Sequence, residues 1–290
     1  MGALLALASA VSYGLSDVLG GVLSRRTSFI RVALLGQVGG LLSMALLAPL
    51  FSATVPAVAD LAWGALSGVG TGLGMVFLFR GMSRGAMSVV VPVSAVGGVA
   101  LPGSVGVVVL GERPAPLAWT GIAVALPALW AVSRGKAGDG RSARAVVDGL
   151  VSGGGIALQY LALAQAAPES AAWPVVAGRV TSILTIAALG ATPYLSRTRH
   201  ADDGQRRGLG LGAALAGALA GLALLCYLLA TRTALITVAV VLSSLYPVIP
   251  ALLGITVLRE RLTSRQTLGL VATLAAPVLI ATPEASAASR

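Results

Sequence analysis

The sequence predicts an all-α membrane protein with ten transmembrane helices, arranged as two inverted-topology repeats of five helices each. Three observations carry this prediction. The chain of 290 residues is 57% hydrophobic and 10% charged, and its mean hydropathy is +0.92. Apolar runs of roughly 20 residues, enough to cross the hydrocarbon core of a bilayer, recur along its whole length. The chain also repeats itself, because residues 84–128 and 232–276 align without a gap at a shift of 148.

Ten apolar runs are long enough to be spans. In the first half they cover Gly2–Ser24, Phe29–Phe51, Leu61–Phe79, Ser88–Leu110 and Pro116–Ser133. In the second half they cover Val146–Gln165, Ala172–Tyr194, Gly208–Ala230, Leu235–Leu258 and Gln266–Ala281. We therefore predict a first five-helix repeat at residues 1–133, a linker loop at 134–145, a second repeat at 146–282 and a tail at 283–290.

The internal repeat is visible in matching motifs. Leu110-x-Glu112-Arg113 recurs as Leu258-x-Glu260-Arg261. Further positions match at the same shift: Arg84 with Arg232, Ala86 with Ala234, Pro102 with Pro250, Gly106 with Gly254 and Gly121 with Gly269. Five helices per half is an odd number, so the second half enters the membrane in the opposite orientation. So long a repeat in so apolar a chain is typical of secondary transporters, whose binding site lies between two related halves.

The net charge of +10 does not indicate nucleic-acid binding, because the basic residues sit in short loops between spans and aromatic residues are only 4% of the chain. They gather after the first, third, fifth, seventh and ninth spans: Arg25, Arg26, Arg84, Arg134, Lys136, Arg141, Arg144, Arg197, Arg199, Arg206, Arg207, Arg259, Arg261 and Arg265. Since positively charged loops stay in the cytoplasm, this pattern places both termini outside.

Glycines recur at a spacing of four in two spans. They are Gly64, Gly68 and Gly72 in the third span, with Gly70 and Gly74 on a neighbouring face, and Gly217 and Gly221 in the eighth span. Small residues at this spacing let membrane helices approach closely. We therefore interpret these glycines as packing residues rather than substrate contacts.

The first span carries a polar stripe at spacings of three and four residues, which is one face of a helix. Its members are Ser9, Ser12, Tyr13, Ser16, Asp17, Gly20 and Ser24. This face has to meet other helices or a water-filled cavity rather than lipid. Asp17 lies roughly 10 Å inside the helix end, and an acidic group at that depth indicates a functional site. We predict that Asp17 binds a coupling proton or cation, the alternative being an ordinary hydrated carboxylate at the interface.

The sixth span holds a matching polar pair. With a slip of one residue in the repeat, Ser12-Tyr13 aligns with Gln159-Tyr160. Two tyrosines in related positions could line both sides of one central site, and their apolar faces and hydroxyls suit an amphiphilic or aromatic ligand. We predict that Tyr13, Gln159 and Tyr160 contact substrate. Simple packing between helices is the alternative.

Three arginines lie near the ends of apolar runs. Arg31 and Arg179 match at the shift of 148, and Arg179 is flanked by apolar and small residues. We predict that Arg179 binds an anionic group of the substrate or neutralises a buried carboxylate, Asp17 or Glu169. Arg80 ends the third span, and we expect it to snorkel to the membrane surface.

The repeated Glu-Arg pairs that close the fourth and ninth spans predict a structural role. Glu112-Arg113 and Glu260-Arg261 are expected to form ion pairs and hydrogen bonds to backbone groups at helix ends. No catalytic arrangement accompanies them. The sequence has one histidine and one cysteine, and it lacks H-E-x-x-H, G-x-S-x-G and Walker A motifs. We therefore expect no enzyme activity, no metal and no cofactor.

Several of these motifs resemble the EamA repeat of the drug/metabolite transporter superfamily. In the first half they are Gly81-Met82-Ser83-Arg84-Gly85-Ala86-Met87-Ser88, Val91-Pro92 and Leu110-Gly111-Glu112-Arg113. In the second half they are Leu245-Tyr246-Pro247-Val248, Arg259-Glu260-Arg261-Leu262 and Gln266-x-x-Gly269. The resemblance implies ten helices in two inverted repeats and ATP-independent movement of small metabolites, often outward. Members usually keep both termini in the cytoplasm, which is opposite to the orientation that the charges predict.

These observations predict a multi-pass carrier in a prokaryotic plasma membrane that exports small organic metabolites or drugs by alternating access. Its expected partners are a small-molecule substrate and the lipid bilayer, not nucleic acid. A second copy of the chain is a further candidate partner, in a homodimer. A lipid flippase and a non-transporting membrane scaffold are alternatives. An intramembrane lipid-modifying enzyme is less favoured, because it would need a carboxylate cluster or a nucleophile–base pair at membrane depth.

Overall fold

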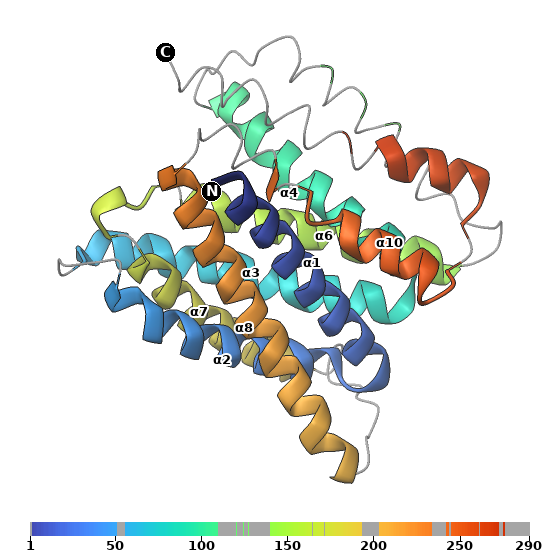
Figure 1. Ribbon diagram of the computed structural model, residues 1–290, viewed down its shortest axis with the longest axis horizontal. Coiled ribbons are helices and arrows are strands. Elements are labelled where there is room, and N and C mark those ends of the chain that lie inside the picture. Colours follow the sequence, from blue (N-terminus) through green and yellow to red (C-terminus); the bar gives the residue numbers. More distant parts are fainter. Residues whose placement is uncertain are drawn as a thin grey trace.

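The regular elements of this computed structural model are helices throughout the residues that it describes (Figure 1). These residues are 2–50, 56–109, 140–163, 165–170, 172–192, 203–233, 242–243, 245–260 and 262–272, with single positions 120, 124, 127 and 275. The first half contains α1 (Gly2–Arg26), α2 (Phe29–Leu47), η1 (Ala48–Leu50), α3 (Val58–Arg84) and α4 (Met87–Val109). The second half contains α6 (Gly140–Leu163), η2 (Pro168–Ser170), α7 (Trp173–Gly190), α8 (Asp203–Thr233) and α10 (Val248–Thr256).

Six helices in the described part of the chain are long and apolar enough to cross a membrane. These candidate spans are Gly2–Arg26, Phe29–Leu50, Val58–Arg84, Ala143–Leu163, Trp173–Gly190 and Gly208–Tyr227. They correspond to the predicted first, second, third, sixth, seventh and eighth spans. The predicted fourth span is α4, whose shorter segment Met87–Gly98 is also apolar. The predicted fifth span lies almost entirely outside the described residues, as do parts of the ninth and tenth.

Helix boundaries differ from the predicted spans mainly at the polar ends. The sixth helix begins at Gly140, before the predicted Val146, so the last residues of the predicted linker are helical. Likewise α8 begins at Asp203 and α3 ends at Arg84, beyond the predicted ends of both runs. Apolar runs mark the part of a helix that meets lipid, whereas its polar extensions are stabilised by backbone hydrogen bonds and leave no hydropathy signal.

The glycines of α3 are packing residues, as the sequence predicts, and they contact two different helices. A Cβ atom on Gly64, Gly68 or Gly72 would collide with α7, near Pro174, Gly178 and Thr185 respectively. One on Gly70 would collide with Gly155 of α6. On the other side of the molecule, Gly217 of α8 lies against the carbonyl oxygen of Gly36 on α2. These contacts confirm that the glycines allow close approach of backbones.

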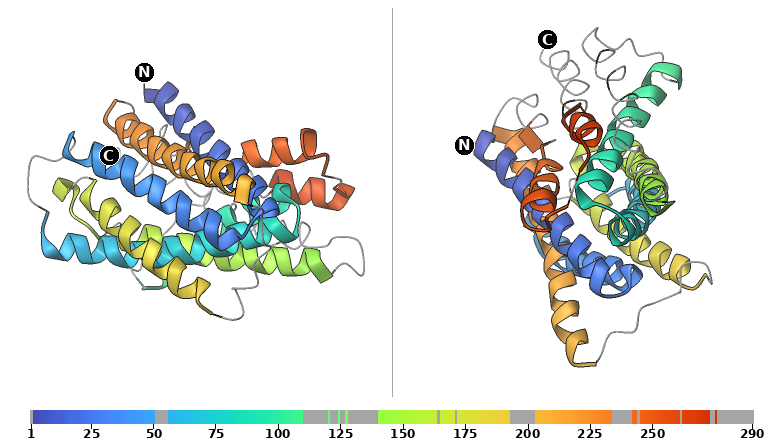
Figure 2. Two further views of the ribbon diagram at one scale, coloured as in Figure 1. Left: turned by 90° about the horizontal axis from the view of Figure 1, so that it is seen from below. Right: turned by 90° about the vertical axis from the view of Figure 1, so that its right-hand side faces the viewer.

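The described helices fall into two bundles, each with helices from both halves of the chain. In the α1 bundle, α1 packs on α8 and α10, and α2 packs on α8. In the α3 bundle, α3 packs on α6 and α7, and α4 packs on α6. The bundles meet where α2 contacts α7 and α3, where α1 contacts α3, and where α4 contacts α10. The right-hand view of Figure 2 shows α1 and α8 on one side, and α4 and α6 on the other.

Contacts along the helices show which ends lie together. Ser16 and Leu23 of α1 contact Ala216 and Gly212 of α8, so these helices run antiparallel. The end of α1 contacts the end of α3, the last residue of α7 lies against Ile30 near the start of α2, and the start of α6 lies against Gly85. We call this the basic end, because the described arginines of the predicted positive loops lie here: Arg25, Arg26, Arg84, Arg144, Arg259 and Arg265.

Candidate functional site

The polar stripe of α1 faces protein, whereas the opposite face of the same helix is exposed. Ser9, Ser16 and Asp17 are 1%, 7% and 5% exposed. The exposed side chains on the other face are Leu4, Leu7, Val11 and Leu15. This division confirms the prediction that lipid does not contact the stripe. Ser16 donates a hydrogen bond to the carbonyl oxygen of Ala216 and thereby joins α1 to α8.

Asp17 lies at the centre of the candidate site without a partner among the described residues. Its carboxylate forms no hydrogen bond or ion pair with any of them. The ion pairs in this part of the chain instead join Glu260 to Arg25, and Asp148 to Arg80 and Arg84. A buried charge normally has a partner, because removing a carboxylate from water is costly. Asp17 therefore differs from Glu260 and Asp148, whose carboxylates have arginine partners.

Three tyrosines from different parts of the chain, Tyr13, Tyr160 and Tyr246, lie within electrostatic range of Asp17. Tyr13 lies one turn before it on α1, and the Tyr13 ring packs against the Tyr246 ring with centroids 5.9 Å apart at an interplanar angle of 50°. The two rings approach closely because Gly14 has no side chain and lies against the carbonyl oxygen of Tyr246. Tyr160 of α6 lies within electrostatic range of Tyr13, Asp17 and the α8 residue Tyr227.

The predicted residue Tyr160 is 49% exposed, so its side chain lines an accessible surface of the bundle. The neighbouring Gln159 lies where α6 packs on Gly70 of α3. Of the predicted site residues, Tyr13, Asp17 and Tyr160 lie within electrostatic range of one another. The structure adds Tyr246 and Tyr227, which the sequence-based site omits. Tyr246 was recognisable only as part of a family motif, and Tyr227 has no matching tyrosine in the first half.

Arg179 is buried on α7 and bound to an amide rather than to a carboxylate. Its Nη1 donates to Oε1 of Gln37 on α2 at 2.7 Å, and the Ser182 hydroxyl donates to the same oxygen at 3.1 Å. The repeat-related Arg31 is exposed. The sequence predicts the burial of Arg179 correctly, but its proposed pairing with Asp17 or Glu169 is wrong among the described residues. Gln37 was missed because a lone glutamine in an apolar run gives no pattern.

At the basic end, Glu260 forms a latch between the two bundles. Its carboxylate accepts hydrogen bonds from Arg25 at 2.6 Å, from the backbone N–H groups of Met87 and Ser88 at 2.9 and 3.0 Å, and from the Ser88 hydroxyl at 2.7 Å. Arg25 also donates to the carbonyl oxygens of Met82 and Gly85. This confirms the predicted structural role of Glu260, while Glu112 lies outside the described residues.

The environment of Glu260 favours its charged form. Burial by itself raises the pKa of the Glu260 carboxyl, but hydrogen bonds from the backbone of Ser88, from Arg25, from the Ser88 hydroxyl and from the backbone of Met87 outweigh it and lower the pKa. The start of α4 adds to this, because the free N–H groups and the dipole of a helix N-terminus attract an anion.

A second ionic cluster lies within the α3 bundle. Arg80 is 5% exposed and donates to Oδ1 of Asp148 on α6 through Nε at 3.0 Å and Nη2 at 2.6 Å. Arg84 approaches the other oxygen of Asp148 at 3.2 Å, and the guanidinium of Arg80 lies 4.3 Å from the centroid of the Phe77 ring. The expectation that Arg80 snorkels is therefore wrong, because Asp148 in the third turn of α6 provides a buried partner.

Part of the chain is similar to a known protein family. Residues 149–282 match the model of the EamA-like transporter family. The second half of the chain is thus similar to a family of membrane transporters. A solved structure described only as "Crystal structure of protein" aligns over 98% of this chain and 98% of its own, with 17% sequence identity and a TM-score of 0.50. That likeness concerns the fold alone. Among curated proteins, no sequence matches this chain.

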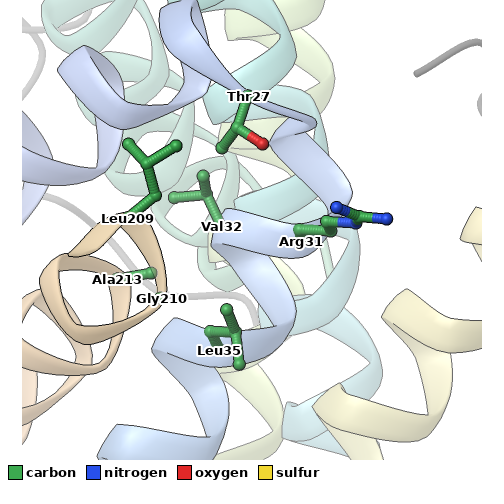
Figure 3. Close-up of a pocket in the computed structure, with 7 residues that line it drawn as sticks. All are labelled: Thr27, Arg31, Val32, Leu35, Leu209, Gly210 and Ala213. Atoms are coloured by element: carbon green, nitrogen blue, oxygen red, sulfur yellow. The ribbon is translucent and has the colours of Figure 1, made fainter. Parts of the chain in front are cut away.

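A small pocket lies near the basic end, between the start of α2 and the first turns of α8 (Figure 3). Its volume is about 130 Å³, and it is lined by Thr27, Arg31, Val32, Leu35, Leu209, Gly210 and Ala213. The Arg31 side chain extends away from the apolar lining residues in Figure 3. None of the predicted site residues lines this pocket. Within the described residues, no cluster of histidine, cysteine and carboxylate side chains could hold a metal ion.

Proposed function

We propose that this EamA-like protein is a secondary transporter that moves small organic metabolites or drugs across the plasma membrane by alternating access, as an exporter. The single observation that carries the proposal is the buried Asp17 of α1, which has no partner among the described residues and lies within electrostatic range of Tyr160 on α6. In a structural scaffold, a buried carboxylate without a partner would only destabilise the fold. A carrier, in contrast, needs a buried group that binds and releases a proton or ion.

The pattern of helix contacts supports an inverted repeat. If the halves are exchanged, the contact of α3 with α6 becomes that of α8 with α1, and the contact of α3 with α7 becomes that of α8 with α2. Both pairs of contacts are present. The same exchange relates the contact of α4 with α6 to that of α10 with α1, if α10 is the second part of the ninth span. Two halves related in this way can rock about a central site.

The latch at the basic end supports a state closed on that side. Arg25 and Glu260 belong to the α1 bundle, whereas their partners Met82, Gly85, Met87 and Ser88 belong to the α3 bundle or the turn that joins α3 to α4. Toward the opposite end, Tyr160 is exposed. We infer that substrate enters the site after the latch opens at the basic end, and leaves at the other end once the latch has closed.

Export follows if the basic end faces the cytoplasm, as the positive-inside rule requires. The exposed Ala143 lies at this end, at the start of α6. In a Cys226→Ser background, Ala143→Cys should be protected from impermeant thiol reagents in intact cells. Ready labelling would reverse the orientation and turn the proposed exporter into an importer.

In the proposed mechanism, Tyr13, Gln159, Tyr160 and Arg179 contact the substrate, and Asp17 carries the coupling proton or cation. Proteoliposomes containing the wild type or Asp17→Asn test this with a panel of radiolabelled solutes, with and without a pH gradient. We expect gradient-driven accumulation by the wild type and loss of that accumulation in Asp17→Asn, with substrate exchange retained. Absence of flux for every solute in the wild type would count against a transporter. Normal accumulation by Asp17→Asn would make Asp17 structural.

A further inference from the structure

We propose that the pocket between α2 and α8 holds part of an anionic phospholipid, with a segment of acyl chain among its apolar residues and the phosphate beside Arg31 and Thr27 (Figure 3). The proposed transport site is elsewhere, since Tyr13, Asp17 and Tyr160 do not line this pocket. The inference therefore concerns a second binding site, and it is independent of the transport function.

The size and lining of the pocket indicate what kind of molecule it holds. Its volume of about 130 Å³ is well below the roughly 300–1,000 Å³ of sites that enclose a whole organic ligand, so it has room for only part of a longer molecule. Its walls are largely apolar, because Val32 and Leu35 of α2 and Leu209 and Ala213 of α8 form them. A segment of hydrocarbon chain fits this lining, whereas a free inorganic anion gains nothing from apolar walls.

The position of the pocket gives lipid access to it. Both helices are candidate spans, and their exposed apolar side chains meet lipid tails: Leu35, Val38, Leu42 and Leu46 on α2, and Leu211, Leu215 and Leu222 on α8. The pocket lies near the basic end of these two helices, where a span leaves the hydrocarbon core and the lipid headgroups begin. A lipid beside α2 and α8 therefore reaches the pocket without leaving the membrane.

The polar groups at the edge of the pocket are free to bind a phosphate. Arg31 is exposed and forms no hydrogen bond or ion pair with any described residue, whereas Arg25, Arg80 and Arg84 are bound to carboxylates. The Thr27 hydroxyl, which also lines the pocket, forms no hydrogen bond with a described residue. In the view of Figure 3, this hydroxyl and the Arg31 guanidinium lie on the same side of the apolar lining residues. A guanidinium is a strong donor to phosphate oxygens.

The start of α2 adds to this attraction for an anion. Ser28 is the N-cap residue of α2, and its side chain makes no capping hydrogen bond to the first N–H groups of the helix. Free N–H groups and the helix dipole attract negative charge at this end. A zwitterionic headgroup carries an ammonium group as well as a phosphate, and the positive charge of Arg31 repels that ammonium. These groups therefore favour an anionic headgroup over a zwitterionic one.

Native mass spectrometry of the full chain in detergent micelles tests the proposal by measuring the affinity of the first bound lipid. Dioleoyl phosphatidylglycerol is the anionic probe, and dioleoyl phosphatidylcholine is the zwitterionic probe with the same acyl chains. We expect the anionic lipid to bind about fivefold more tightly or better, and Arg31→Gln to weaken its binding about fivefold, which is the usual contribution of one basic residue near a membrane surface. Inorganic phosphate at millimolar concentration should not displace the lipid, because it does not occupy the apolar part of the pocket.

Two further variants separate this site from general effects. Arg144→Gln is the matched control, because Arg144 is also exposed at the basic end but does not line the pocket, and it should leave the lipid affinity unchanged. Gly210→Leu fills the pocket, since a Cβ atom on Gly210 already lies 3.7 Å from Cδ1 of Leu35, and it should weaken binding of the anionic lipid while Arg31 stays in place. If Gly210→Leu fails to fold, glycerophosphoglycerol, the same headgroup without acyl chains, serves as the probe and should not displace the lipid.

Four outcomes overturn the proposal. Equal binding of the two lipids would show that the site does not select an anionic headgroup. An equal loss of affinity in Arg31→Gln and Arg144→Gln would reduce the effect to the overall charge of the basic end. Unchanged binding in a folded Gly210→Leu variant would show that no acyl chain occupies the pocket. Displacement of the lipid by inorganic phosphate or glycerophosphoglycerol would make this a site for a soluble anion.

Discussion

The Arg25 guanidinium and the Glu260 carboxylate, 235 positions apart in the chain, lie 2.6 Å apart from Nη2 to Oε1. This pair joins the end of α1 to the loop after α10, and the same carboxylate binds the first N–H groups of α4. One side chain thus connects both bundles at the basic end. In a carrier that opens on alternate sides, such a contact has to form in one state and break in the other.

Glu260→Gln should loosen the latch without unfolding the helices. The amide still fits the space, but it loses the ionic attraction to Arg25 and to the helix N-terminus. We expect the backbone amides of Met87 and Ser88 to exchange hydrogen about tenfold faster or more, since a hydrogen bond to a charged group contributes about 1.5–3 kcal/mol. Hydrogen–deuterium exchange measures this, with Asp60→Asn as a control. Unchanged exchange at both amides would show that Glu260 does not hold the bundles together.

The latch should respond to acid only well below neutral pH. Because the pKa of Glu260 is lower in the folded protein than its ordinary value of 4.5, its contribution is complete above that value and is lost as the pH falls through the lowered pKa. Protection of the Ser88 amide, corrected for intrinsic exchange, should stay constant from neutral pH down to about pH 5. Protection that already declines between pH 7 and pH 5 would contradict this environment for Glu260.

The cluster of Arg80, Asp148 and Arg84 should stabilise the fold without taking part in transport. Asp148→Asn leaves the buried Arg80 without its counter-charge, and we expect a loss of about 3–5 kcal/mol in the free energy of unfolding. Arg84→Gln removes a guanidinium whose side chain is 38% exposed. It should lower the free energy of unfolding by no more than about 1 kcal/mol. Chemical unfolding in micelles gives both values. Equal effects of the two substitutions would contradict the different burial of the two arginines.

Glycines at helix contacts should tolerate a methyl group far less than glycines elsewhere. Gly217→Ala places a Cβ atom against the carbonyl oxygen of Gly36, and we expect it to cost about 1–3 kcal/mol because α2 and α8 have to separate. Gly154→Ala is the matched control, since a Cβ atom there meets nothing within 4 Å. It should be neutral or stabilising through helix propensity. Similar melting temperatures for the two variants would show that close packing does not require Gly217.

Much of this arrangement was predictable because periodicity is a local property of the sequence. The polar stripe of α1 and the glycines of α3 repeat at helical spacing, so their buried faces follow from the residues alone. The repeat also relates Tyr13 to Tyr160 in sequence, and both lie within electrostatic range of Asp17. Tyr13 and Tyr160 are far apart in the sequence, and in proteins with repeated halves such related positions lie around one axis.

The partners of the charged residues could not be predicted in the same way. Arg179 binds Gln37, and Arg80 binds Asp148, across 142 and 68 positions of the chain. An isolated glutamine or aspartate in an apolar run is not part of any sequence pattern from which its partner could be predicted. Which of several carboxylates an arginine meets depends on helix rotation and depth, and these are set by packing between helices rather than by any one helix.

Distances between the two bundles at both ends of the molecule test alternating access most directly. Spin labels at Arg26→Cys and Ala143→Cys report on the basic end, and labels at Ala3→Cys and Ala57→Cys report on the other end, all at exposed positions in a Cys226→Ser background. Double electron–electron resonance compares wild type with Glu260→Gln. The account predicts that the variant lengthens the distance at the basic end and shortens the distance at the other. Distances that stay unchanged, or that change in the same direction at both ends, would contradict alternating access.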